Sequence, residues 1–171
     1  MTRDRGWYAV HVRSNQERTT AAFVADRGVE VFLPTYRVPS RRRDRRTMIE
    51  RPLFAGYLFA RFAPGATERV QVLRAPGTVR VVGFGDRPAR VPDAVIESLR
   101  IVVGAGGDDV RPHPLVEAGR PVQVVGGPFA GARGVLAEAP RRPRSLVVEI
   151  ELLGRAVAVP IEVDQVIPLF D

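Results

Sequence analysis

The segment from Arg51 to Phe62, RPLFAGYLFARF, limits the possible folds of this chain more than any other segment. It carries four aromatic rings, and a strand sends successive side chains to opposite faces of its sheet. One continuous strand would therefore have two apolar faces, with Phe54, Leu58 and Phe62 on one and Leu53, Tyr57 and Phe59 on the other. Because one apolar face is enough to build a core, either both faces are covered within the fold or one is reserved for a partner.

Strand and helix patterns alternate on both sides of this segment. A capping box of Ser14 and Glu17, followed by apolar residues, predicts a first helix, and Gly28 is placed to end it. The stretch SRRRDRR at 40–46 has no apolar periodicity and predicts an exposed loop or hairpin tip. The order of elements predicts an α+β fold in which helices pack on a sheet. We expect strands over 7–12, 29–34, 51–62 and 78–84, and helices over 15–27, 67–74 and 92–103.

The pattern changes after residue 103. Residues 104–115 contain glycines, prolines and acidic residues with almost nothing to bury, which predicts a flexible linker. Beyond the linker, short β-type runs lie between turn residues at 122–125, 134–136, 146–152, 156–160 and 166–169. Five short strands without a helix pattern predict a small closed barrel. We therefore expect two domains, 1–103 and 116–171.

The net charge of +7 is unevenly distributed along the chain. Residues 1–103 carry 19 Arg and 10 acidic residues, whereas residues 104–171 carry 7 Arg and 9 acidic residues. A basic first half attracts phosphates or an acidic protein surface. The apolar runs are too short to span a bilayer, nothing at the N-terminus resembles a signal peptide, and cysteine is absent from the sequence. We therefore expect a soluble, cytoplasmic protein without a membrane partner.

Residues that usually carry catalysis are scarce in this sequence. Neither His11 nor His113 has a carboxylate or a serine at a recognisable spacing. The stretch GAGGDD at 104–109 superficially resembles a dinucleotide-binding loop, but Pro112 and Pro114 forbid the helix that would hold a pyrophosphate. We therefore expect no enzyme activity, no metal site and no cofactor.

Two remaining features point to binding. The charged stretch 40–46 is either a solvated loop that protects a sheet edge or a finger that contacts phosphates, and the residues alone favour neither. In VQVVGGPFAGARGVL at 122–136, glycines surround Phe129. Such a loop is either a plain tight turn or a contact point for a partner.

Taken together, these stretches resemble the NusG-type transcription elongation factors. VEAGRPVQVVGGPFAGARGVLAE and VEIELLGRAVAVPIEVDQVIPL resemble the KOW domain of that family, and WYAVHV, RPLFAGYLFARF and RAPGTVRVVGFGDRPARVPDAVIESL resemble its NGN domain. The resemblance covers essentially the whole chain and is closest to specialised paralogues of the RfaH and UpxY kind. It implies a ferredoxin-like NGN domain, with an antiparallel sheet flanked by helices, and a five-stranded SH3-like KOW barrel. The β pattern of the second domain predicts this barrel and not a helical, autoinhibited form.

The resemblance also implies partners. The NGN domain would dock on the clamp helices of RNA polymerase, reach toward the opposite wall of the DNA cleft and suppress pausing and termination. The KOW domain would recruit a ribosomal protein or Rho, the non-template DNA strand is a further partner, and we expect a monomer. The alternative is an RNA- or rRNA-binding KOW protein of the translation machinery, which the basic charge also suits.

Three sets of contact residues follow from these features. Polymerase contacts implied by the resemblance are His11, Phe54, Tyr57, Phe59 and Phe84. Nucleic-acid contacts are Arg13 and Gln16 by resemblance, and Arg41, Arg42 and Arg43 from the charged stretch. Partner contacts of the KOW domain are Phe129, Leu153 and Arg155. Alternation places Phe54 on the same face as Leu58 and Phe62, which we expect to face the core, yet Phe54 aligns with a contact residue of the family. We therefore expect a twist or a bulge at Gly56 to turn the Phe54 side chain.

Overall fold

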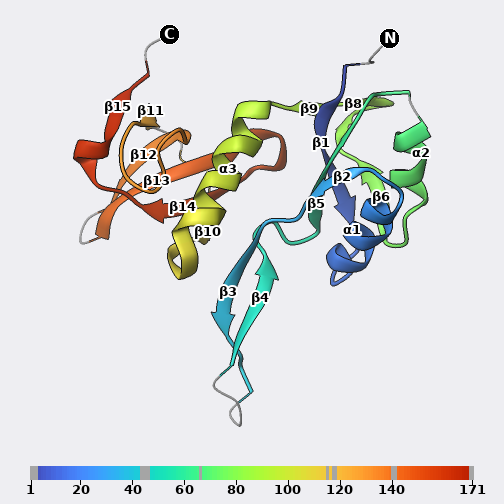
Figure 1. Ribbon diagram of the computed structural model, residues 1–171, viewed down its shortest axis with the longest axis horizontal. Helices are drawn as coiled ribbons and strands as arrows, with labels where there is room; N and C mark the ends of the chain where they lie inside the picture. Colours follow the sequence, from blue (N-terminus) through green and yellow to red (C-terminus); the bar gives the residue numbers. More distant parts are fainter. Residues whose placement is uncertain are drawn as a thin grey trace. The chain divides into compact units, whose positions relative to one another are not determined.

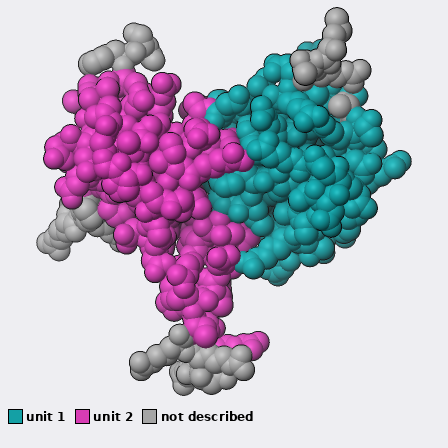
Figure 2. All heavy atoms as spheres, viewed as in Figure 1, with its two compact units in different colours: residues 1–34, 54–93 teal, residues 35–53, 94–171 magenta. Residues whose placement is uncertain are grey.

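The computed structural model describes residues 4–42, 47–65, 67–114, 116, 119–139 and 142–169 (Figure 1). It divides into two compact units (Figure 2). Unit 1 comprises residues 1–34 and 54–93, and unit 2 comprises residues 35–53 and 94–171. This division assigns the segment around 40–46 and the third helix to unit 2. The domain boundaries expected from the sequence, 1–103 and 116–171, remain a prediction.

Unit 1 is built on one antiparallel sheet with two helices. The strand order is β2-β5-β1-β6, and β9 pairs with β1. The strands are β1 (Gly6–Val12), β2 (Glu30–Phe32), β5 (Tyr57–Phe62), β6 (Thr78–Val81) and β9 (Arg90–Val91), and the helices are α1 (Glu17–Asp26) and α2 (Thr67–Arg74). A short hairpin of β7 (Gly83–Phe84) and β8 (Arg87–Pro88) completes the unit. These elements confirm the α+β architecture predicted for the first half of the chain.

One buried cluster of unit 1 lies on one face of this sheet, and Ala9 and Phe59 are fully buried on the other face. The alternation of β1 and β5 places every second side chain on the face of the cluster, where the Tyr8 and Phe62 rings stack at 4.6 Å between centroids. Helices α1 and α2 contribute Val24 and Val72, which are fully buried. Burying an aliphatic side chain of this kind stabilises the fold by about 1.5–3 kcal/mol. The buried cluster comprises Tyr8, Val10, Val12, Val24, Val29, Leu58, Ala60, Phe62, Val72 and Ala75.

The aromatic segment RPLFAGYLFARF is not one strand, because the chain leaves one strand at Pro52 and enters β5 at Tyr57. A turn joins them: the Tyr57 N–H donates to the Phe54 carbonyl at 2.9 Å, and Gly56 has φ +84°. Positive φ at this position is typical of a type II turn and favours glycine. Phe54 consequently packs edge-on against Phe59, with centroids 5.7 Å apart. The expectation that Gly56 redirects Phe54 is confirmed, although the feature is a turn between strands and not a bulge within one.

The predicted capping box at the first helix is wrong. The N-cap residue of α1 is Gln16, and no side chain caps this helix end. Asn15 has φ +64°, which places Ser14 outside the geometry of a cap. Glu17 instead accepts a hydrogen bond from the distant Gly56 N–H at 2.9 Å.

Unit 2 contains a six-stranded antiparallel sheet in the order β10-β14-β13-β12-β11-β15. The strands are β10 (Arg111–His113), β11 (Arg120–Val124), β12 (Arg133–Ala139), β13 (Arg142–Ile150), β14 (Arg155–Pro160) and β15 (Val166–Pro168). Short 3-10 turns, η2 (Glu151–Leu153) and η3 (Val163–Gln165), separate the later strands. The five predicted strands are confirmed in position. The described part of residues 111–169 has no α-helix, in line with the predicted all-β second domain.

Most of the expected flexible linker at 104–115 carries regular secondary structure. Helix α3 (Asp93–Gly106) continues through the first glycines, η1 (Gly107–Asp109) follows it, and β10 pairs with β14. Val110 is only 1% exposed, so this segment has a buried apolar side chain that packs into the fold. The composition of the segment did not reveal this. Packing overrides the weak helix propensity of glycine here, and an edge strand tolerates Pro112.

The charged stretch belongs to a separate hairpin of β3 (Thr35–Pro39) and β4 (Met48–Pro52). Among the described strands, these two pair only with each other. Figure 2 shows the hairpin as a narrow projection of unit 2. A hairpin at this point matches the prediction, and residues 43–46 of the charged stretch lie outside the described residues. None of the helices in the described ranges has the length and hydropathy required to cross a bilayer.

Replacing Gly134 in β12 with alanine is expected to destabilise unit 2 by about 1–3 kcal/mol. A Cβ there would collide with the Val147 backbone carbonyl and would lie 3.1 Å from Leu146 Cδ1. Urea denaturation of the purified chain measures the effect. Gly104→Ala in α3 is the control, because no atom lies within 4 Å of its added Cβ, and we expect it to stabilise the helix by about 0.5–1 kcal/mol. Equal stability of the two variants would contradict the crowding at β12.

Candidate functional site

The turn before β5 organises the predicted partner-binding residues of unit 1. Gly56 is held from two sides, because its N–H donates to Glu17 Oε1 at 2.9 Å and its carbonyl accepts from the Val12 N–H at 2.8 Å. The next residue, Tyr57, begins β5. The backbone conformation at Gly56 therefore determines the position of the Tyr57 Cα atom and the direction of its side chain.

Tyr57 and His11 form a stacked pair on the sheet face opposite the core cluster. They are register partners across β5 and β1, and their ring centroids lie 5.2 Å apart with 26° between planes. Both side chains are half-buried, so the pair retains surface that a partner can contact. Aromatic rings of this kind contribute strongly to protein interfaces.

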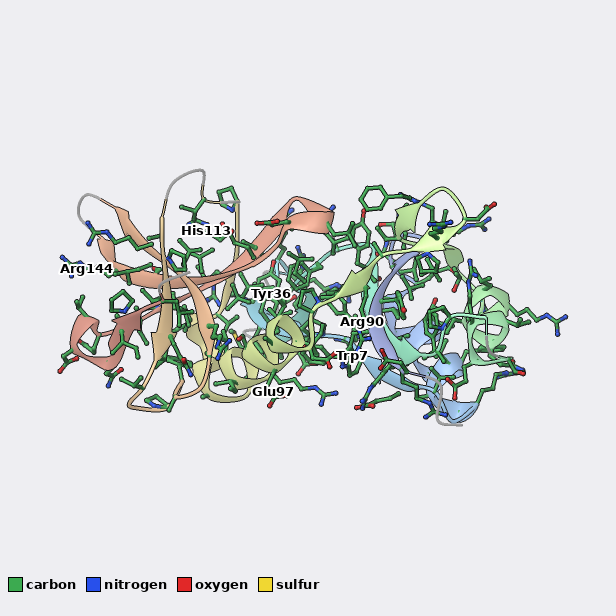
Figure 3. The ribbon with its side chains drawn as sticks, turned by 90° about the horizontal axis from the view of Figure 1, so that it is seen from above. Trp7, Tyr36, Arg90, Glu97, His113 and Arg144 are labelled. Atoms are coloured by element: carbon green, nitrogen blue, oxygen red, sulfur yellow. The ribbon has the colours of Figure 1, made fainter. Side chains whose placement is uncertain are left out.

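Phe54 and Phe59 lie beside this pair but are buried. Phe54 is 1% exposed and Phe59 is fully buried, with the Phe32 ring 6.2 Å from Phe59. Contact of Phe54 and Phe59 with a partner remains a prediction. In this conformation the two rings pack beside the pair of His11 and Tyr57 and are not exposed at the surface. Trp7 on β1, which Figure 3 labels near Arg90 of the paired β9, is also buried, at 5% exposed.

Phe84 is the most exposed of the predicted polymerase contacts, at 77%. It stands on the β7–β8 hairpin, which closes tightly because a Cβ at Gly83 would collide with the Arg87 carbonyl. Glycine is therefore required where the two strands approach each other. An exposed phenylalanine on a tight hairpin is available for contact with a partner.

The predicted nucleic-acid contacts Arg13 and Gln16 lie where β1 leads into α1. Arg13 is exposed, and its backbone N–H donates to the Gly77 carbonyl at 2.8 Å. Gln16 lies over Gly77, where an added Cβ would come within 2.5 Å of Gln16 Oε1. The backbone of Arg13 is thus held by a hydrogen bond, while its side chain is exposed to solvent.

Arg41 and Arg42 are exposed near the end of the β3–β4 hairpin. The hairpin is closed by the Ser40 N–H, which donates to the Thr47 carbonyl at 2.8 Å, and the Arg42 N–H donates to Ser40 Oγ at 3.3 Å. Arg43 lies outside the described residues. The two described arginines are presented to solvent on a projecting element.

The predicted contacts in the second domain do not share one environment. Phe129 is 8% exposed, and a Cβ at Gly106 of α3 would lie 3.6 Å from its ring, so Phe129 faces the end of that helix. The neighbouring Arg133 N–H donates to Ser98 Oγ of α3 at 2.8 Å. Leu153 and Arg155 are half-buried on either side of a turn whose glycine has φ +63°.

Among the described residues of unit 1, the pKa values of Tyr8 and Arg90 are shifted. Burial raises the pKa of the Tyr8 hydroxyl, and the positive charge of Arg90 opposes this effect. The hydrogen bond to Asp4, at 2.8 Å, raises the pKa of Arg90. Within the described ranges, no group of three or more His, Cys, Asp or Glu side chains is arranged to hold a metal.

Sequence reasoning missed the role of Glu17, the buried carboxylate that holds Gly56. The two residues are 39 positions apart, and no local pattern links them. Glu17 occupies the first turn of a helix whose predicted cap is not formed, and the sequence pattern did not reveal this. Because the Glu17 carboxylate does not take part in a capping box, it can accept a hydrogen bond from a distant residue.

Comparisons with known proteins agree on one family. The family profile described as transcription termination factor nusG matches residues 5–100. The transcription termination/antitermination protein NusG of Pseudomonas aeruginosa is 30% identical over 173 residues, which cover 94% of this chain and 96% of that protein. The protein of the same description from Escherichia coli strain K12 is 31% identical over 173 residues, covering 94% of each. A solved structure described as "Domain interaction in Thermotoga maritima NusG" covers 95% of this chain and 96% of its own, with a TM-score of 0.55 and 22% identity, and supports the fold.

Proposed function

The chain belongs to the NusG family, and on this premise we propose that it is a transcription elongation factor that binds RNA polymerase and suppresses pausing and termination. The observation that carries the proposal is the family match over residues 5–100, together with relatives that align along nearly the whole chain. The part-exposed pair of His11 and Tyr57 lies within the matched region. This pair is the surface that we assign to the polymerase.

The partners are assigned by domain. Unit 1 docks on the clamp helices of the polymerase through His11 and Tyr57, with the buried Phe54 and Phe59 supporting this pair and the exposed Phe84 on its hairpin as a further contact with the clamp helices. From there it reaches toward the opposite wall of the cleft. The β-rich second domain recruits a ribosomal protein or Rho through Leu153 and Arg155. Phe129 joins this contact if its packing against α3 is relieved. The protein acts in the cytoplasm, as a monomer and without a catalytic step of its own.

The experiment is in vitro transcription with purified polymerase from the same organism. Adding the chain to a template with a strong pause site is expected to shorten the pause and to raise the read-through of a terminator. Reactions with and without Rho separate suppressed termination from assisted termination. Salt-sensitive binding to RNA together with no affinity for polymerase would replace this proposal with the RNA-binding alternative.

Nucleic-acid contact by the β3–β4 hairpin gives a separate prediction. Replacing Arg41 and Arg42 with glutamine is expected to lower the salt dependence of binding to an elongation complex, by about 0.9 in the log–log slope for each phosphate that the variant no longer neutralises. The control is Arg120→Gln, which removes an exposed arginine from β11. Binding measured between low and physiological salt gives both slopes. An unchanged slope in the double variant would show that the hairpin is only a solvated projection.

A further inference from the structure

Glu17 is a charged residue in the interior of unit 1. It is only 6% exposed, whereas acidic side chains are almost never so deeply buried unless they are partnered. Its Oε1 atom accepts a hydrogen bond from the Gly56 N–H at 2.9 Å. The carboxylate therefore joins α1 to the turn before β5.

The position of Glu17 in its helix explains why this buried charge is tolerated. It lies in the first turn of α1, where no side chain caps the helix end. The aligned peptide dipoles of a helix give its N-terminal end a partial positive charge that favours a carboxylate. The backbone N–H of Gly56 adds a charge-assisted hydrogen bond, which is stronger than a bond between neutral groups.

The turn held by Glu17 is the one that orients the aromatic face. Gly56 has φ +84°, and its carbonyl is fixed by the Val12 N–H at 2.8 Å. Glu17 thus fixes one side of the Gly56 residue and β1 fixes the other. Phe54 precedes the turn and packs on Phe59, while Tyr57 follows it and stacks on His11.

We propose that Glu17 is a positioning residue for the polymerase-binding face, acting through Gly56 on the stacked pair of Tyr57 and His11. The inference rests on the proposed function for the identity of the partner. Glu17 does not itself contact the polymerase, because it is buried beneath the turn. Loss of its hydrogen bond removes one of the contacts that hold the turn, and the Tyr57 ring then samples orientations that do not match the partner.

Three variants of the full chain test this role. Glu17→Ala removes the acceptor, and Glu17→Gln keeps an Oε1 acceptor for the Gly56 N–H. Thr20→Val is the matched control: Thr20 is also a fully buried polar residue of α1, but its Oγ1 donates to the Pro76 carbonyl at 2.5 Å and not to the turn. Thr20→Val therefore measures how losing a buried hydrogen bond of α1, away from the turn, affects amide exchange and polymerase binding.

The first readout needs no polymerase. Hydrogen exchange of the Gly56 amide is expected to be about tenfold or more faster in Glu17→Ala than in wild type, and to stay slow in Glu17→Gln and Thr20→Val. The ring current of Tyr57 shifts the His11 ring protons in NMR spectra, and this shift is expected to collapse toward zero only in Glu17→Ala. Slow Gly56 exchange and an unchanged His11 shift in Glu17→Ala would overturn the proposal.

The second readout is affinity for core polymerase in the absence of nucleic acid. We expect Glu17→Ala to bind about tenfold more weakly, as the loss of one buried charge-assisted hydrogen bond implies, and Glu17→Gln to stay within about twofold of wild type. Thr20→Val should bind like wild type. A Glu17→Gln variant or a Thr20→Val variant as weak as Glu17→Ala would overturn the positioning role in favour of general destabilisation. If wild type itself does not bind, the proposed function fails, while exchange and ring-current shifts still decide whether Glu17 positions the pair.

Discussion

Replacing Phe59 with alanine is expected to lower the free energy of unfolding by about 3–5 kcal/mol. Phe59 is fully buried in β5, where the edge of Phe54 meets it at 5.7 Å and Phe32 lies 6.2 Å away. Phe32 and Phe59 are register partners on the paired strands β2 and β5, so the space left by the Phe59 ring cannot close easily. Urea denaturation followed by circular dichroism measures the change.

The control for Phe59 lies on the same strand. Arg61 is exposed and forms an ion pair with Glu30 at 3.4 Å, which is worth at most about 1 kcal/mol. Arg61→Ala should therefore unfold close to wild type. If Phe59→Ala were equally stable, the ring would not be part of the core of unit 1.

This prediction changes how the polymerase-facing surface should be tested. The resemblance placed Phe59 among the contact residues, but a charged or truncated variant at a fully buried position destabilises the fold before it reports on a surface. A loss of binding in such a variant would not identify a contact. The informative substitutions are at Tyr57 and His11, which are only half-buried.

Periodicity predicted the regular elements of this chain well because alternation reports burial directly. Leu58 and Phe62, which the sequence pattern assigned to one face, lie together in one buried cluster. The strands of the second half were found for a related reason, since turn residues separate short apolar runs. In both cases the signal is local.

The failures have a common cause in contacts between distant residues. The alternation rule assumes a continuous strand, and it failed at Phe54 because a turn at Gly56 interrupts the strand. Composition did not reveal the secondary structure within 104–115, because burial of Val110 and pairing of β10 with β14 outweigh the glycine-rich composition. The capping box failed because Glu17 bonds to a residue 39 positions away. Local patterns contain no information about these partners.

Replacing Tyr57 with alanine is expected to weaken binding to RNA polymerase by about 10–100-fold, the size of effect seen when an aromatic anchor is removed from an interface. Tyr57 is half-buried and lies outside the buried cluster of unit 1, so the fold should survive its loss. Tyr57→Phe keeps the ring that stacks on His11 and should retain most of the affinity. Leu73→Ala removes an exposed side chain of α2, at 44% exposure, and should bind like wild type. Unchanged binding by a folded Tyr57→Ala variant would remove this pair from the interface.

The stacked geometry makes a sharper version of this test possible. Each ring limits the motion of the other, with centroids 5.2 Å apart, so His11→Ala should also weaken binding even where Tyr57 is intact. Residues that act together show non-additive effects in a double-mutant cycle. The variant lacking both rings should therefore lose less affinity than the product of the two single losses. Strict additivity in polymerase titrations would mean that the rings contact the partner independently, and the face would then be two separate contacts instead of one preformed surface.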